Sequence, residues 1–252
     1  MLSKQGFQSL FRQQIPFEPT AGQETAIDML SEFVTTPQHN GLFVLKGYAG
    51  TGKTTLVSAL VRTLNILSQR VVLLAPTGRA AKVFSVYSGN KAFTIHKHIY
   101  RVQMQEGMLH FSRKDNKLNR TLFIVDEVSM ISDSQQRSDL FSSRSVLEDL
   151  INYVFEGEQN KLLFIGDDAQ LPPVHSDESP ALQIEYLKHS FNLSLTSCQL
   201  TDVVRQALDS GILYNANSCV ENLKPGIMVF PISVRKNFLI SSVSQVAIWR
   251  RN

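Results

Sequence analysis

The sequence predicts an α/β fold in which a parallel β-sheet is flanked by helices. Apolar runs of the buried-strand type recur at residues 42–45, 71–75, 122–125 and 162–165. Residues 55–67 have leucines at helical spacing and separate the first two runs, as in a βαβ unit. A glycine-rich run lies between the first strand and this helix.

That glycine-rich run fits the pattern G-x-x-x-x-G-K-[ST], with Gly47, Gly52, Lys53 and Thr54 in the fixed places. Glycines let backbone N–H groups approach an anion, the lysine supplies a charge for phosphates, and the hydroxyl binds Mg²⁺. The alternative is an ordinary glycine-rich turn. The run predicts a nucleoside triphosphate site formed by Gly47, Tyr48, Ala49, Gly50, Thr51, Gly52, Lys53, Thr54 and Thr55.

Length and composition favour a globular protein, with one large domain or one domain plus part of another in 252 residues. No apolar run approaches the roughly 20 residues that span a bilayer. Residues 1–14 lack the apolar core of a signal peptide, so we expect a cytoplasmic protein without membrane contact. Cys198 and Cys219 are expected to be reduced, buried thiols.

Positive charge is concentrated in residues 75–120, where nine Lys or Arg face two acids, a local charge of +7. The chain as a whole has +3, which leaves −4 for the remainder. A basic segment beside a nucleotide site indicates a phosphate-rich polymer as partner. The alternative is a solvated positive face.

In chain order, Thr20 and Gln23 open a helix that extends to about Val34. Their spacing predicts a capping box, and the alternative is a contact from Gln23 to an adenine edge. After the second strand, residues 76–82 turn into another helix. Arg79 and Lys82 share one face of it, near the sheet edge where a polyanion could pass.

We expect residues 94–100 to form a short helix or turn. His96 and His98 are two positions apart and would point in different directions on a helix, so we do not expect them to bind a metal ion together. Residues 100–113 alternate around Glu106–Gly107 as in a β-hairpin. A small basic hairpin inserted in an α/β domain is typical of a functional insertion.

The third strand ends at Asp126 and Glu127, which suit the Mg²⁺ shell and the polarisation of the attacking water. Alternatively, these acids only begin the next turn. Gln170 follows the fourth strand, as a neutral γ-phosphate sensor would, and Arg205 either reaches a phosphate or is a surface residue. Further predicted elements are helices at 140–155 and 181–189 and a strand at 193–200.

In this order, the stretches from about Phe17 to Val220 resemble the RecD-like branch of superfamily 1 DNA helicases. The resemblance rests on Gln23, the glycine-rich run, Ala-Pro-Thr-Gly-Arg-Ala-Ala-Lys, Thr-Ile-His, Val-Asp-Glu-Val-Ser-Met, Gly-Asp-Asp-Ala-Gln-Leu-Pro-Pro-Val and Val-Val-Arg-Gln. It implies a RecA-like sheet and ATP with Mg²⁺ as cofactors.

The resemblance also implies roles for single residues. Gln23 contacts adenine, Thr54 and Asp126 hold Mg²⁺, and the catalytic set is Lys53, Glu127 as base, Gln170 as sensor and Arg205 as arginine finger. The path of single-stranded DNA is lined by Pro76, Thr77, Arg79, Lys82 and His96. The hairpin matches a strand-separating pin of domain 1B, and movement is 5′ to 3′.

From this resemblance we expect residues 1–200 to form a RecA-like ATPase core, with the hairpin inserted at about 99–118, and residues 201–252 to begin an incomplete second core. The later family motifs are not found. The expected function is an ATP-dependent DNA helicase motor core acting on single strands and duplex junctions in repair or recombination. Alternatives are a nucleotide-dependent single-strand-binding module without motor activity and a P-loop enzyme acting on a small molecule.

Overall fold

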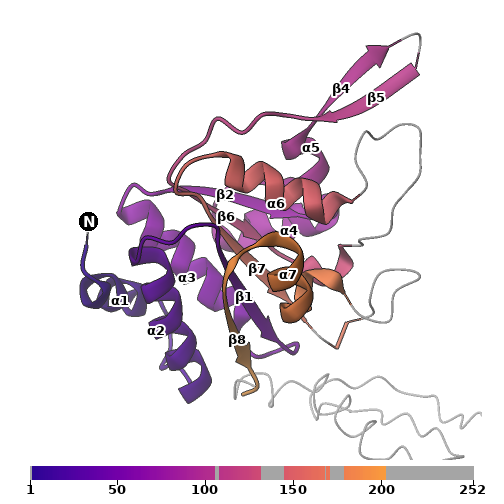
Figure 1. Cartoon of the computed structure of the whole chain (residues 1–252). Coiled ribbons are helices and arrows are strands. Elements are labelled where there is room, and N and C mark those ends of the chain that lie inside the picture. The colour runs from indigo at the N-terminus through magenta and orange to yellow at the C-terminus, as the bar shows by residue number, and fades with distance from the viewer. Residues whose placement is uncertain (1, 106–107, 132–144, 168, 171–178, 203–252) are drawn as a thin grey trace, which may run out of the picture. The chain divides into compact units, whose positions relative to one another are not determined.

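The computed structural model describes residues 2–105, 108–131, 145–167, 169–170 and 179–202 (Figure 1). The chain divides into two units, Met1–Val203 and Val204–Asn252, and the described residues lie in the first. The predicted start of a second core at 201–252 therefore falls almost entirely outside the described residues, and so do Arg205 and Cys219.

A six-stranded, all-parallel sheet forms the centre of the described unit and confirms the predicted α/β fold. Its strand order is β3-β2-β6-β7-β1-β8. The strands are β1 Gly41–Gly47, β2 Arg70–Ala75, β3 Ala92–Thr94, β6 Thr121–Val125, β7 Lys161–Gly166 and β8 Ser194–Leu200. The short β3 was not predicted, because three residues carry no readable periodicity.

Helices cover both faces of the sheet, and alternate strand residues point to each side (Figure 1). Phe43 and Leu45 of β1 pack with α1 Lys4–Gln13, α2 Ala21–Thr35, α3 Lys53–Ile66 and α4 Gly78–Ser88. Leu42 and Val44 pack toward α5 Ile95–Ile99, α6 Val146–Glu156, α7 Ile184–Phe191 and the 3₁₀ turns η1 Val128–Met130 and η2 Pro180–Leu182. Among the described residues, no helix is long and apolar enough to cross a membrane.

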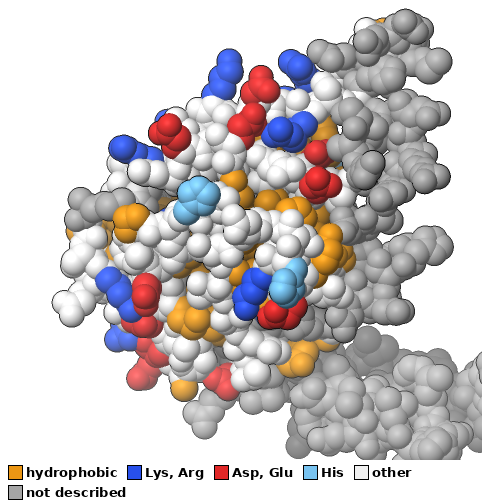
Figure 2. All heavy atoms as spheres, in the orientation of Figure 1, with side chains coloured by type: hydrophobic (Ala, Val, Ile, Leu, Met, Phe, Trp, Pro, Cys, Tyr) orange, Lys and Arg blue, Asp and Glu red, His pale blue; other side chains and the backbone are white. Residues whose placement is uncertain are grey.

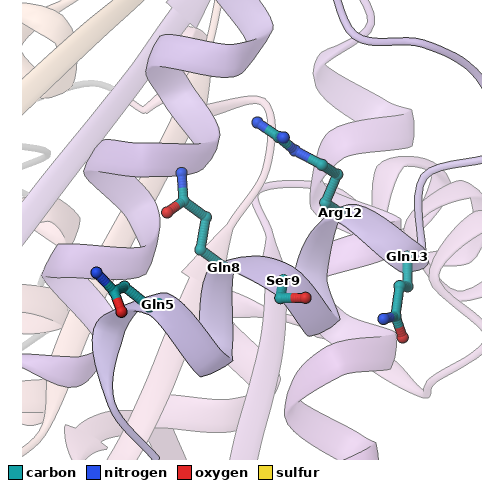
Figure 3. Close-up of a pocket in the computed structure, with 5 residues that line it drawn as sticks. All are labelled: Gln5, Gln8, Ser9, Arg12 and Gln13. Atoms are coloured by element: carbon teal, nitrogen blue, oxygen red, sulfur yellow. The ribbon is translucent and has the colours of Figure 1, made fainter.

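Helix α1 is an element that the sequence reasoning missed. Ser3 caps it, and Phe7 and Phe11, one turn apart, are fully buried against the core. Its apolar residues, Phe7, Leu10 and Phe11, have helical spacing, which was a usable signal for this helix. The polar side of α1 lines a pocket of about 390 Å³, formed by Gln5, Gln8, Ser9, Arg12 and Gln13 (Figure 3). None of these is a predicted site residue.

Two predicted helices have different bounds in the structure. The helix predicted at 140–155 begins at Val146, because Ser145 is extended and its hydroxyl caps the first turn. Residues 140–144 lie outside those described. The helix predicted at 181–189 is divided at Gln183, which is extended, into η2 and α7. Cys198 is a buried free thiol, as predicted.

The predicted hairpin is confirmed as β4 Tyr100–Gln105 and β5 Met108–Arg113, paired antiparallel with Gln105 opposite Met108. It projects from the body of the unit (Figure 1). Its base is fixed to α6, because the Tyr100 hydroxyl donates to buried Asp149 and Arg113 lies 2.9 Å from Glu156. The hairpin is therefore anchored at one end.

The segment that follows the last strand, β8, is hydrogen-bonded to the start of α2. Asp202 follows β8, and its Oδ2 accepts a hydrogen bond from the Gly22 backbone N–H at 3.2 Å. In the same turn of α2, Thr20 and Gln23 form both bonds of a capping box, which confirms that prediction.

Candidate nucleotide and magnesium site

The loop between β1 and α3 needs its glycines for two physical reasons. Gly50 and Gly52 have φ values of +83° and +87°, in the left-handed region where a Cβ is unfavourable. At Gly47 the reason is space, because an added Cβ would lie 2.8 Å from Thr51 Oγ1 and 2.9 Å from the Leu200 carbonyl oxygen. The loop is therefore a tight backbone turn packed against β8.

The start of α3 has no side-chain cap. Gly52 occupies the N-cap position, and no side chain accepts from the first N–H groups. In α1, α2, α4, α5 and α6 a serine or threonine hydroxyl fills that place, while α7 also has no side-chain cap. Uncapped N–H groups and the helix dipole together favour an anion at this position.

Lys53 is held within this loop. Its Nζ donates to the carbonyl oxygens of Gly47 and Tyr48, and it lies 3.8 Å from Asp167 Oδ2. Asp167 is only 5% exposed. The sequence reasoning gave Asp167 no role, although its place directly after β7 was a usable signal. This strand lies beside β1, which leads into the glycine-rich loop of residues 47–55, the predicted phosphate loop. Lys53 and Asp167 form a largely buried ion pair at the carboxyl ends of β1 and β7.

The strand order explains why the predicted residues come together. β7 lies between β1 and β6, so the carboxyl ends of these three strands are neighbours. They carry Lys53 after β1, Asp126 and Glu127 after β6, and Asp167 and Gln170 after β7. Residues that are more than a hundred positions apart in the sequence therefore lie together at the carboxyl ends of these strands. The side chain of Thr54 is exposed there.

Asp126 has a partner on each carboxylate oxygen. The Glu127 backbone N–H donates to Oδ1 at 2.9 Å, and the Tyr87 hydroxyl from α4 donates to Oδ2. Burial raises the pKa of the Asp126 carboxyl, while these two bonds and the Lys53 charge oppose the increase. The sequence reasoning gave Tyr87 no role and missed this contact.

Glu127 has an unusual backbone and environment. Its φ and ψ of 55° and 40° are left-handed, which costs on the order of 1–3 kcal/mol in a residue with a Cβ. Burial is the largest cause of the raised pKa of its carboxyl, and repulsion from Asp126 adds to it. A carboxylate with a raised pKa is a stronger base, which suits the activation of water.

Gln170 is fixed beside that carboxylate. Its Oε1 accepts from the Ser129 hydroxyl at 2.9 Å, and a hydrogen bond to Glu127 lowers the pKa of the glutamate. The position after β7 is the predicted one. Its role as γ-phosphate sensor stays a prediction.

Gln23 is buried and uses both ends of its amide within the protein. Its Oε1 accepts from the Thr20 N–H at 3.1 Å, and its Nε2 donates to the Thr51 carbonyl at 2.9 Å. It therefore joins α2 to the phosphate loop. The predicted adenine contact stays a prediction.

The predicted DNA-contacting residues lie around the starts of α4 and α5. Thr77 caps α4 by accepting from the Ala80 N–H at 3.2 Å, and Pro76 precedes it. The side chains of Arg79, Lys82 and His96 are exposed. These residues are accessible to a ligand, and their contact with DNA stays a prediction.

The basic segment of residues 75–120 is not all free surface. Arg113 pairs with Glu156, and Lys114 donates to the carbonyl oxygens of Lys97 and His98. The face drawn in Figure 2 shows basic and acidic side chains interspersed. Part of the positive charge therefore serves the fold.

A parallel sheet of this order, with a glycine-rich loop, a lysine and acids at its carboxyl edge, defines a P-loop NTPase. The chain belongs to the AAA domain family, whose pattern matches residues 20–218. This membership and the relatives below confirm the predicted resemblance to superfamily 1 DNA helicases.

Two curated relatives are similar over most of this chain. It is 29% identical over 190 residues to ATP-dependent DNA helicase dda of Enterobacteria phage T4, covering 74% of this chain and 39% of that protein. It is 32% identical over 185 residues to the ATP-dependent RecD2 DNA helicase of Deinococcus radiodurans, covering 73% and 22%. The crystal structure of Pif1 helicase from Candida albicans matches with a TM-score of 0.49 and 20% identity, over 81% of this chain and 44% of that one. The chain thus spans less than half of each of these proteins.

Proposed function

We propose that this chain is the ATPase core of a DNA helicase, which binds and hydrolyses Mg-ATP and couples the hydrolysis to 5′-to-3′ movement along single-stranded DNA. The observation that carries the proposal is that Lys53, Asp126 and Glu127 lie together at the carboxyl ends of the strands. They lie beside the start of α3, which has no side-chain cap. Two relatives named as ATP-dependent DNA helicases support it.

In this proposal the phosphate loop and the start of α3 bind the triphosphate, with Lys53 exchanging its carbonyl contacts for phosphate oxygens. The Thr54 hydroxyl and the Asp126 carboxylate are the donor types that Mg²⁺ prefers. Bound Mg²⁺ would neutralise charge on the phosphates. Glu127 takes a proton from the attacking water, and Gln170 fixes the orientation of that glutamate.

The DNA part of the proposal rests on the cations of α4. Arg79 and Lys82 are exposed in the first turns of that helix, on the strand-end side of β2. The hairpin separates the strands at a duplex junction in this proposal, and its base is fixed to α6 by Tyr100 and Arg113. Relatives named as RecD subunits of the RecBCD enzyme favour recombination or repair as the process.

The decisive experiment is ATP hydrolysis by the 252-residue chain with and without single-stranded DNA. Lys53→Ala is the blank, and Lys188→Ala, an exposed lysine on α7, is the matched control. We expect DNA to stimulate turnover in the wild type and the control, and none above background in the blank. Unchanged hydrolysis in Lys53→Ala would remove the P-loop assignment.

ATP and DNA binding without any turnover would identify the alternative, a nucleotide-dependent DNA-binding module. Direction is tested on duplexes that carry a single-stranded tail at one end only. We expect unwinding from the 5′ tail, and unwinding from the 3′ tail alone would contradict the proposed polarity.

A further inference from the structure

The phenol of Tyr87 is placed on Asp126 by packing. Its ring stacks on that of buried Phe84, with centroids 5.0 Å apart and an interplanar angle of 27°. Its hydroxyl donates to Asp126 Oδ2 from a position 39 residues away in sequence. Because the ring is held by Phe84, the hydroxyl fixes the orientation of the carboxylate.

The same helix carries the cations proposed to contact DNA. Thr77 caps the start of α4, Arg79 and Lys82 lie exposed in its first turns, and Tyr87 lies in its last turn. A single helix therefore connects the DNA-facing surface with a ligand of the magnesium ion. A shift of α4 on DNA binding would move the Tyr87 hydroxyl relative to Asp126.

We propose that Tyr87 is a positioning residue that orients Asp126 for Mg²⁺ and transmits DNA binding at α4 to the metal site. This proposal rests on the proposed function. Groups that hydrogen-bond a metal ligand from outside typically contribute 10–100-fold to metal affinity. Loss of the Tyr87 hydroxyl should therefore raise the Mg²⁺ concentration that supports nucleotide binding, while the folded state persists.

The test measures binding of a fluorescent, non-hydrolysable ATP analogue to the full chain during titration with Mg²⁺. Tyr87→Phe removes the hydroxyl and keeps the ring that packs on Phe84. Tyr186→Phe is a matched control, because it removes another tyrosine hydroxyl and keeps a ring that packs on an aromatic neighbour, Phe191, on α7. The titrations are repeated with a single-stranded oligonucleotide.

We expect the half-saturating Mg²⁺ concentration to rise about tenfold in Tyr87→Phe and to stay unchanged in Tyr186→Phe. The oligonucleotide should shift this concentration in the wild type and not in Tyr87→Phe. An unchanged or lower concentration in Tyr87→Phe would overturn the proposal, and an intact DNA-induced shift would overturn the link to α4. Failure of the wild type to bind the analogue would instead count against the proposed function.

Discussion

At Glu127, three unfavourable features coincide in one residue. Its backbone is left-handed, its carboxylate is half-buried, and the carboxylate of Asp126, the preceding residue, repels it. Each feature costs stability in the folded chain, and all three place a basic carboxylate near the phosphate loop. Strain and buried charge at one residue are typical of an active site.

Glu127→Gln is expected to stabilise the folded chain while removing hydrolysis. The raised pKa means that the native state binds this proton more tightly than the unfolded state, so the ionised form costs stability above the native pKa. Below the ordinary value near 4.5 the carboxyl is protonated in both states and this cost disappears.

The measurement is thermal unfolding of both proteins between pH 4 and 8. Because Glu127 is only half-buried, solvent screening limits the gain to about 1 kcal/mol at pH 8, or a Tm increase of about 2–4 °C. The difference should shrink toward pH 4. A variant that is less stable than the wild type at pH 8 would contradict this account.

At the residue scale, the glycine-rich pattern singled out the glycines and Lys53, because it encodes backbone requirements directly. The two acids were singled out by their place after a buried strand, and the roles of all these residues stay predictions. Sequence reasoning could not identify the partners of these residues. The Tyr87–Asp126 bond and the Lys53–Asp167 pair join separate elements, and their existence depends on how a helix is rotated against the sheet.

At the scale of elements, the turn between α6 and β7 leaves no room for a side chain at Gly157. Gly157 ends α6, and a Cβ there would overlap the Leu118 carbonyl oxygen and Asn160 Nδ2. Asn160 in turn bonds to the carbonyl oxygens of Leu118 and Val154 and accepts from the Thr121 N–H. This turn therefore links α6 to the entry of β6.

Gly157→Ala is expected to lower the free energy of unfolding by about 1–3 kcal/mol, as overpacking typically does. The backbone at Gly157 has an ordinary φ of −88°, so the cause is space alone. Gly78→Ala is the matched control, because a Cβ at Gly78 on α4 meets nothing within 4 Å. Urea unfolding of both variants tests this, and equal midpoints would contradict it.

Element types were predictable where periodicity was long, as in α2, α3 and the inner strands. The predicted helix boundaries were wrong where a single polar residue sets the start of the helix, as Ser145 does for α6 and Gln183 does for α7. The hairpin could be predicted because apolar and polar residues alternate in both of its strands on either side of a short turn.

In the whole described unit, Arg113 and Lys114 of the basic segment serve internal contacts, so the charge count of the sequence overstates the free positive surface. Arg79 and Lys82 remain exposed on one helix. DNA affinity should depend on these two cations more than on the net charge of the chain.

Arg79→Ala combined with Lys82→Ala should weaken single-stranded DNA binding and reduce its salt dependence. Removing two phosphate contacts makes the slope of log affinity against log salt shallower by about 1.4. Fluorescence anisotropy over a series of salt concentrations measures it. Lys4→Ala combined with Lys188→Ala, both outside the basic segment, is the control, and identical slopes in the two double variants would refute the assignment.

The join between Asp202 and Gly22 has a mechanical consequence. Asp202 holds the first turn of α2, and in that turn Gln23 holds the Thr51 carbonyl of the phosphate loop. Tension applied to the backbone at the end of β8 would therefore reach the loop through side-chain hydrogen bonds as well as through β1. A force at this strand end would thus act on the predicted nucleotide-binding loop through the contacts of only a few residues.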